Sequence, residues 1–129
     1  MATGESGQLV HSFEAAADLS AKQFFAMQID TAGKINLGDG GAAAPDVLIG
    51  VLQNKPKAGE AGQVQSSGIT KAVAGATVTA GADLTSDSTG RFVAAITTDI
   101  ILGICLQGAA VGEVFSMLIV GPYESTTVT

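Results

Sequence analysis

The feature that most constrains the fold of this chain is a glycine pattern that occurs twice. Residues 47–68 and 100–121 align at one offset, with apolar residues on both sides of the first glycine in each segment. The alternative is chance similarity in a chain rich in Gly and Ala, but four coincident positions favour a duplication, and therefore two related halves. The matching pairs are Gly50/Gly103, Gly59/Gly112, Glu60/Glu113 and Gly68/Gly121.

Short apolar or alternating segments, separated by Gly-containing turns, predict an all-β fold. Gly33 and Gly90 stand where hairpin turns need a positive φ, and Gly50 and Gly103 lie inside strands, where glycine marks a close backbone approach. Strands of this length and spacing are typical of a sandwich or a small barrel. An Ala-rich stretch leaves a short helix over residues 13–26 as an alternative. We expect strands at residues 8–14, 23–29, 34–37, 47–53, 63–69, 91–96, 100–107 and 114–120.

The organisation expected is one small Gly/Ala-rich β domain, a barrel or sandwich with two related halves and extended termini. The length of 129 residues suits a single domain. We place an N-terminal arm at residues 1–8, the β domain at 9–121 and a C-terminal tail at 122–129. The strand patterns predict a core that includes Ile49, Val51, Leu102, Ile104, Leu118 and Val120.

The charge balance argues against several classes of partner. Only 14% of residues are charged, and 6 basic against 12 acidic residues give a net charge of −6. A chain so poor in Lys and Arg is badly suited to bind phosphate backbones, so we expect no nucleic-acid partner. The apolar stretch between Asp99 and Glu113 is too short and too interrupted to span a bilayer, so we expect no membrane partner. Apolar surface is then buried inside the domain or against other chains, as in a symmetric oligomer.

Catalytic chemistry has little support in the residue types present. His11 is the single histidine and Cys105 the single cysteine, so there is no His/Cys zinc site, and we expect Cys105 to be a buried, inert thiol. A weak calcium site in the loop 37–46 and a small enzyme pocket at His11 or Cys105 are the alternatives. We expect no catalytic, cofactor-binding or metal-binding residues, no cofactor and no enzymatic activity.

The candidate contact residues lie near the termini and at an aromatic pair. Residues 1–7 are polar and unpatterned, and an alternating strand then begins at Gln8, as in an arm that adds a strand to a neighbour's sheet. A frayed end is the alternative. Adjacent strand residues point to opposite faces, so one phenylalanine of the pair 24–25 can enter the core while the other meets a partner. The candidates for contacts with a partner or with another copy of the chain are Gln8, Leu9, Val10, Phe24, Phe25 and Tyr123.

Ordered motifs across most of the chain resemble the small capsid decoration, or cement, proteins of tailed bacteriophages. The resemblance covers roughly residues 9–120 and lies in segments 15–21, 48–51, 58–64, 67–69, 78–84, 90–91, 101–104 and 112–120. The long loop 38–45 and the Thr-rich tail depart from it. It implies a β-rich protein without catalytic residues.

The resemblance also implies a partner and a location. Such a protein binds the outside of the expanded phage head, bridges subunits of the major capsid protein, and does so as a homo-trimer at threefold or quasi-threefold positions. It is made in the host cytoplasm and ends on the outer capsid surface of the virion. The alternative is a carbohydrate- or host-surface-binding β module of a virion or surface layer.

Overall fold

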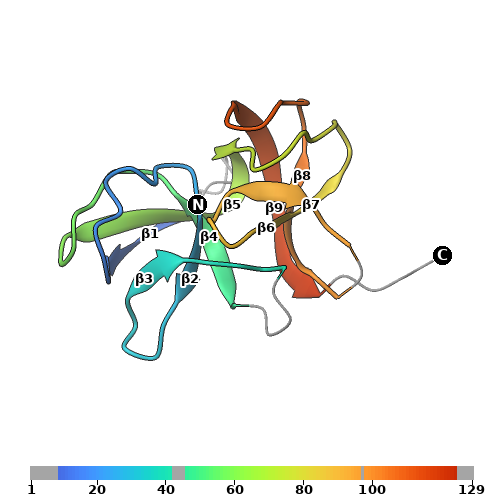
Figure 1. Ribbon diagram of the computed structural model, residues 1–129. Helices are drawn as coiled ribbons and strands as arrows, with labels where there is room; N and C mark the ends of the chain where they lie inside the picture. The colour runs from blue at the N-terminus through green and yellow to red at the C-terminus, as the bar shows by residue number, and fades with distance from the viewer. Residues whose placement is uncertain (1–8, 42–45, 97, 125–129) are drawn as a thin grey trace.

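The computed structural model describes residues 9–41, 46–96 and 98–124, and these form nine β-strands (Figure 1). The all-β prediction is confirmed, and no helix occurs in the described part of the chain, so the helix alternative for residues 13–26 is wrong there. The sheet does not close into a barrel. The strands are β1 (Leu9–Glu14), β2 (Ala26–Ile29), β3 (Ile35–Leu37), β4 (Leu48–Leu52), β5 (Ala61–Val73), β6 (Asp83–Ser86), β7 (Phe92–Ala94), β8 (Ile100–Cys105) and β9 (Val114–Glu124).

The strand pairings divide the chain into two halves that repeat one topology. In the first half β2 pairs with β3 and β4, and β4 pairs with β5. In the second half β6 pairs with β7 and β8, and β8 pairs with β9. The long β5 serves both halves, because its first part pairs with β1 and its second part with β9. In Figure 1 the halves lie side by side, with β5 passing between them.

The glutamate shared by the two repeats closes the same turn in each half. Lys57 N–H donates to Glu60 Oε1 at 2.8 Å, and Ala110 N–H donates to Glu113 Oε1 at 2.8 Å. The glycine before each glutamate has a positive φ, 85° at Gly59 and 84° at Gly112, which explains why glycine recurs there. The repeated sequence pattern thus specifies a repeated local structure.

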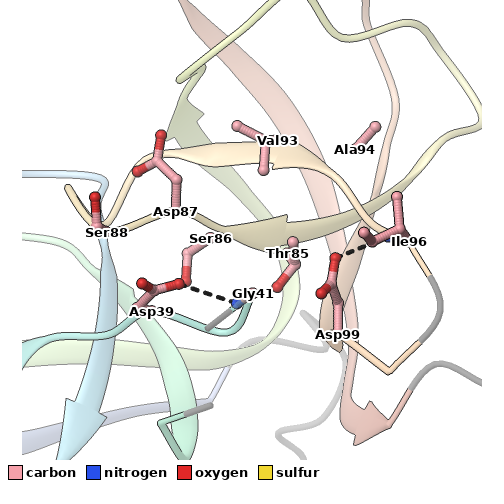
Figure 2. A pocket seen from close by; sticks show the side chains of 10 residues that line it. All are labelled: Asp39, Gly41, Thr85, Ser86, Asp87, Ser88, Val93, Ala94, Ile96 and Asp99. Atoms are coloured by element: carbon pink, nitrogen blue, oxygen red, sulfur yellow. Dashed lines mark hydrogen bonds between the residues drawn. The ribbon is translucent and has the colours of Figure 1, made fainter. Parts of the chain in front are cut away.

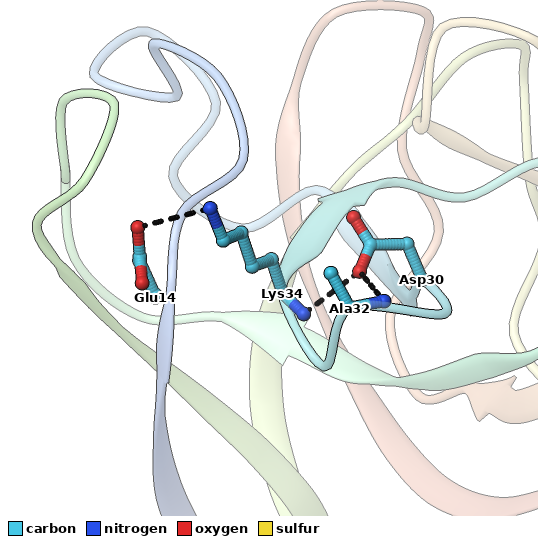
Figure 3. A network of polar contacts seen from close by, with 4 residues as sticks. All are labelled: Glu14, Asp30, Ala32 and Lys34. Atoms are coloured by element: carbon cyan, nitrogen blue, oxygen red, sulfur yellow. Dashed lines mark hydrogen bonds and ion pairs between the residues drawn. The ribbon is translucent and has the colours of Figure 1, made fainter.

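An aspartate organises the hairpin turn between the first two strands of each half. Asp30 Oδ1 accepts hydrogen bonds from the backbone N–H groups of Ala32 and Lys34, both at 2.9 Å (Figure 3). Asp87 Oδ1 does the same in the second half. The glycines of these turns, Gly33 and Gly90, have positive φ values of 78° and 82°, as predicted.

Two glycines inside strands allow the partner strand to approach closely, which confirms their predicted role. A Cβ atom on Gly50 would overlap the backbone oxygen of Gln65, and one on Gly103 would lie 2.6 Å from the backbone oxygen of Leu118. The ladder register shifts beside each glycine, next to Gly50 in β2–β4 and next to Gly103 in β8–β9. Glycine is therefore required at both positions by space.

The core consists of two clusters, and the core prediction is correct only in part. Val51 and Leu102 are fully buried, while Ile49, Ile104 and Leu118 are half-buried. Val120 is 42% exposed, so its assignment to the core is wrong. The reason is the alternation of β9, which points Phe115, Met117 and Ile119 inward and the residues between them outward.

Four differences between the observed and the predicted strands affect the surfaces of the molecule. Strand β6 was not expected, β2 begins at Ala26 instead of residue 23, β5 extends to Val73, and β9 continues through a cis Gly121–Pro122 bond to Glu124. The part of the predicted tail that is described, residues 122–124, thus belongs to the sheet. In the described residues no helix is long and apolar enough to cross a membrane.

Candidate binding surfaces

Strand β1 carries two of the predicted contact residues at an exposed sheet edge. Leu9 and Val10 are both exposed, and β1 pairs with β5 alone among the described strands. The Leu9 N–H group donates to Ser67 Oγ at 3.1 Å, which fastens the start of the strand to β5. Gln8 lies outside the described residues. The edge itself suits the addition of a partner strand.

The phenylalanine pair lies in a turn before β2, so its assignment to a strand is wrong. Phe24 has a positive φ of 71°, a backbone conformation that ends the extended run. Both rings are half-buried and pack against different core clusters. Lys71 Nζ lies 6.0 Å from the centre of the Phe24 ring, and Lys22 Nζ lies 5.2 Å from that of Phe25. The contact role of the pair stays a prediction.

Val10 and Phe24 meet in a shallow groove at the junction of the two halves. The groove has a volume of about 420 Å³ and combines apolar side chains with amides. Its floor is formed by Gln63 and Gln65 of β5, and Gln53 Nε2 donates to Thr70 Oγ1 across it at 2.8 Å. Two residues that are far apart in the sequence therefore share one surface.

Tyr123 lies elsewhere, at the far end of β9. It pairs with Ile101 of β8 and is exposed. A hollow of about 240 Å³ beside it is lined by Pro122, Val47 and Ile100 among others, and is mostly apolar. This hollow shares no lining residue with the groove at Val10 and Phe24.

Sequence reasoning missed an apolar surface on the second half, which we call the outer face. It is the solvent side of the second part of β5, of β9 and of β8, where directly opposed residues share one side of the sheet. Its signal was the apolar character of residues 114–120, interrupted only by Ser116, which predicts a strand covered on both faces. Its apolar members are Ile69, Val73, Ile104, Leu106, Val114, Leu118 and Val120.

A polar cleft between the halves contains three carboxylates that serve the backbone around them (Figure 2). Asp39 Oδ1 accepts from Gly41 N–H at 3.0 Å, and Asp99 Oδ2 accepts from Ile96 N–H at 2.8 Å. Asp87 holds the hairpin turn described above. Each carboxylate therefore has a local structural role.

Serine and threonine side chains complete the wall of this cleft. Ser86 Oγ donates to Gly38 O at 2.6 Å and accepts from Gly40 N–H at 2.9 Å, which fixes the loop after β3 to β6. The adjacent Thr85 hydroxyl is buried against Gly40 without a hydrogen-bond partner among the described residues. The loop between β3 and β4 is thus held by strand β6 of the other half.

The other residues considered for catalysis or metal binding lie on different elements of the fold. His11 is exposed on β1, whereas Cys105 is buried, as predicted, and its thiol donates to Gln107 O at 3.2 Å. In the loop proposed for calcium, Asp46 Oδ2 accepts from Asp39 N–H at 2.9 Å and from Gln28 Nε2 at 3.2 Å. Within the described ranges, no group of three or more His, Cys, Asp or Glu residues could hold a metal ion.

One carboxyl has a shifted pKa. The Ser20 side chain and the Ser20 backbone N–H both hydrogen-bond to Asp18, and together they hold its pKa below the usual range. Asp18 is exposed, and it stabilises the turn that precedes the phenylalanine pair.

Among solved structures, the fold resembles the N base of the head fiber protein gp8.5 of bacteriophage phi29. The TM-score is 0.61, the sequence identity is 15%, and the match covers 88% of this chain and 94% of the other. The two proteins share a fold. No protein-family model matches the chain, and no curated protein sequence matches it.

Proposed function

We propose that this chain is a decoration protein of a phage head. It binds the outer capsid surface as a homo-trimer and stabilises the shell by bridging subunits of the major capsid protein. Its action is that of a structural protein, without catalysis and without a cofactor.

The observation that carries the proposal is the fold shared with the head fiber N base. The match covers both repeated halves of this chain and nearly all of that N base, so it concerns the whole architecture. At 15% identity the likeness lies in the fold, and the sequence motifs of residues 9–120 add an independent resemblance to head decoration proteins.

The surfaces of the chain support the same proposal. An exposed edge strand and the outer face offer backbone pairing and apolar contact area, which are the means by which a protein adheres without covalent chemistry. The groove adds amide and hydroxyl groups beside Val10 and Phe24. A repeated shell multiplies such contacts, so that modest individual affinities give a high occupancy.

The proposal is tested by co-sedimentation with empty, expanded heads that lack this chain. The full-length protein is mixed with them at increasing concentration, and unexpanded shells serve as the matched control. We expect saturable binding to the expanded heads at a fixed number of copies, and an increase in the temperature at which the decorated heads open.

Two outcomes would count against the proposal. Binding that does not saturate, or that is equal on expanded and unexpanded shells, would show nonspecific adhesion. A saturable interaction with glycans in the absence of any head would favour a host-surface-binding module instead.

A further inference from the structure

The two halves have equivalent strands, but the corresponding faces differ in exposure. The backbone hydrogen bonds Ala15 N–H to Glu60 O and Ala74 N–H to Glu113 O, both 2.9 Å, place β1 beside β5 in the same way as the second part of β5 beside β9. Any outward-facing residue of the second half therefore has a counterpart in the first. The outer face can therefore be compared, position by position, with the first half of the same chain.

The corresponding positions in the first half are partly covered by the chain itself, since Val51, the counterpart of Ile104, is fully buried and Gln65, the counterpart of Leu118, is 4% exposed. Leu118 corresponds to Gln65, Leu106 to Gln53 and Val120 to Ser67, at the offset at which Gly50 matches Gly103. The framework therefore accepts polar residues at these three positions, whereas Ile104 has an apolar counterpart, Val51. Ile69 and Val114 nevertheless remain 55% and 53% exposed.

Two opposite charges stand at opposite edges of the outer face. Lys71 is exposed on β5, and Asp83 of β6 is exposed opposite Ile104 of β8. Three inter-strand spacings separate β5 from β6, which is roughly 14 Å and too far for a direct ion pair within one chain. Neither residue has an ion-pair partner among the described residues.

We propose that a second copy of this chain covers the outer face, with Lys71 of one copy opposite Asp83 of the next. The chain carries a net charge of −6, so two copies repel unless the contact region contains an attractive pair. Here the β5 edge is basic, the β6 edge is acidic, and the surface between them is apolar. These edges are complementary in a closed ring of copies. The inference deepens the proposed function and rests on it for its place on the head.

Self-association of the full chain is measured by sedimentation equilibrium at physiological salt, without heads. We expect the wild-type protein to be oligomeric. Leu118→Gln copies the residue of the first half, where the Gln65 amide donates to the carbonyl oxygens of Ser67 and Ile69 on its own strand, and it removes apolar contact area from the outer face. We expect it to raise the dissociation constant about tenfold or more. Ile96→Gln, at an exposed position in the loop between β7 and β8, is the matched control and leaves association unchanged.

The charge pair is tested by reversal. Lys71→Glu and Asp83→Lys each bring like charges together and weaken association, whereas the double variant restores the attraction. Because the two positions are farther apart than the screening length of about 8 Å at this salt, recovery in the double variant reports contact between copies. Circular dichroism at low concentration checks that each variant folds.

Several outcomes would overturn the inference. They are a wild-type protein that stays monomeric at all concentrations, an unchanged dissociation constant for Leu118→Gln, and a double variant that fails to recover. A monomer that begins to associate once residues 1–8 are deleted would show that the chain covers its own outer face. A monomer that still binds heads overturns this inference and the trimer, but leaves the proposed head binding standing. An oligomer that does not bind heads overturns only the proposed function.

Discussion

Phe24 occupies in the first half the position that Gly81 occupies in the second. Phe24 N–H donates to Leu52 O at 2.7 Å, and Gly81 N–H donates to Cys105 O at 2.7 Å. Both residues have a positive φ, 71° and 91°. The repeated backbone thus imposes a left-handed conformation on a phenylalanine, and the packing of its ring offsets a cost of roughly 1–2 kcal/mol.

This relationship predicts an unusual order of stability at position 24. Phe24→Gly and Phe24→Ala both lose the ring packing, but only glycine relieves the backbone. We expect Phe24→Gly to be more stable than Phe24→Ala by about 1 kcal/mol, measured by denaturant unfolding. The reciprocal control is Gly81→Ala, which meets no atoms within 4 Å and should lose a similar amount through the backbone alone. Equal stabilities for the two Phe24 variants would contradict the shared conformation.

The turn glutamates should contribute through a single acceptor atom. Glu113→Ala removes the oxygen that accepts from Ala110 N–H, and we expect it to lower the free energy of unfolding by about 0.5–1.5 kcal/mol. Glu113→Gln keeps an acceptor at that position and should recover most of the loss in thermal melts. A glutamine variant as unstable as the alanine variant would mean that the negative charge, and not the turn bond, is what matters.

Truncations in β8 should separate the two sides of the strand. Leu102 is fully buried, so Leu102→Ala should cost about 2–4 kcal/mol in every state of association. Ile104 is half-buried on the outer face, so Ile104→Ala should cost clearly less in the monomer. Denaturant melts at low protein concentration compare the two. A larger loss for Ile104→Ala would place that side chain in the core after all.

The sequence was informative where a local rule decides the structure. Gly33, Gly50, Gly90 and Gly103 could be assigned from turn chemistry and close packing, because only glycine meets those demands. Strand β6 could not be found, since Leu84 is its one large apolar residue and the buried Ser86 is satisfied by the distant loop at Gly38 and Gly40. Contacts that distant in the sequence leave no local pattern.

The contact surfaces were predicted less well for a related reason. Val10 and Phe24 were both singled out, but only the pairing of β1 with β5 brings them into one groove. Val120 was assigned to the core because the apolar run 117–120 does not reveal which side of the strand faces solvent. The repeat resolves this ambiguity, because its first half carries Ser67 at the equivalent place.

The N-terminal arm stays a prediction and can be tested separately. Residues 1–7 carry a single charge, Glu5, so we expect their binding to depend on backbone pairing and to weaken only modestly as salt rises. Deleting residues 1–8 should leave the melting temperature nearly unchanged and reduce the occupancy on expanded heads. Unchanged occupancy would move the contact to the groove, the outer face or the end of β9.

The most direct test of the proposed function is electron cryo-microscopy of expanded heads before and after the protein is added. We predict ordered difference density on the outer surface at threefold or quasi-threefold positions, into which three copies of this two-half β fold can be placed, each in contact with more than one major capsid subunit. Heads that show no added density, or density confined to the inner surface, would contradict the proposal.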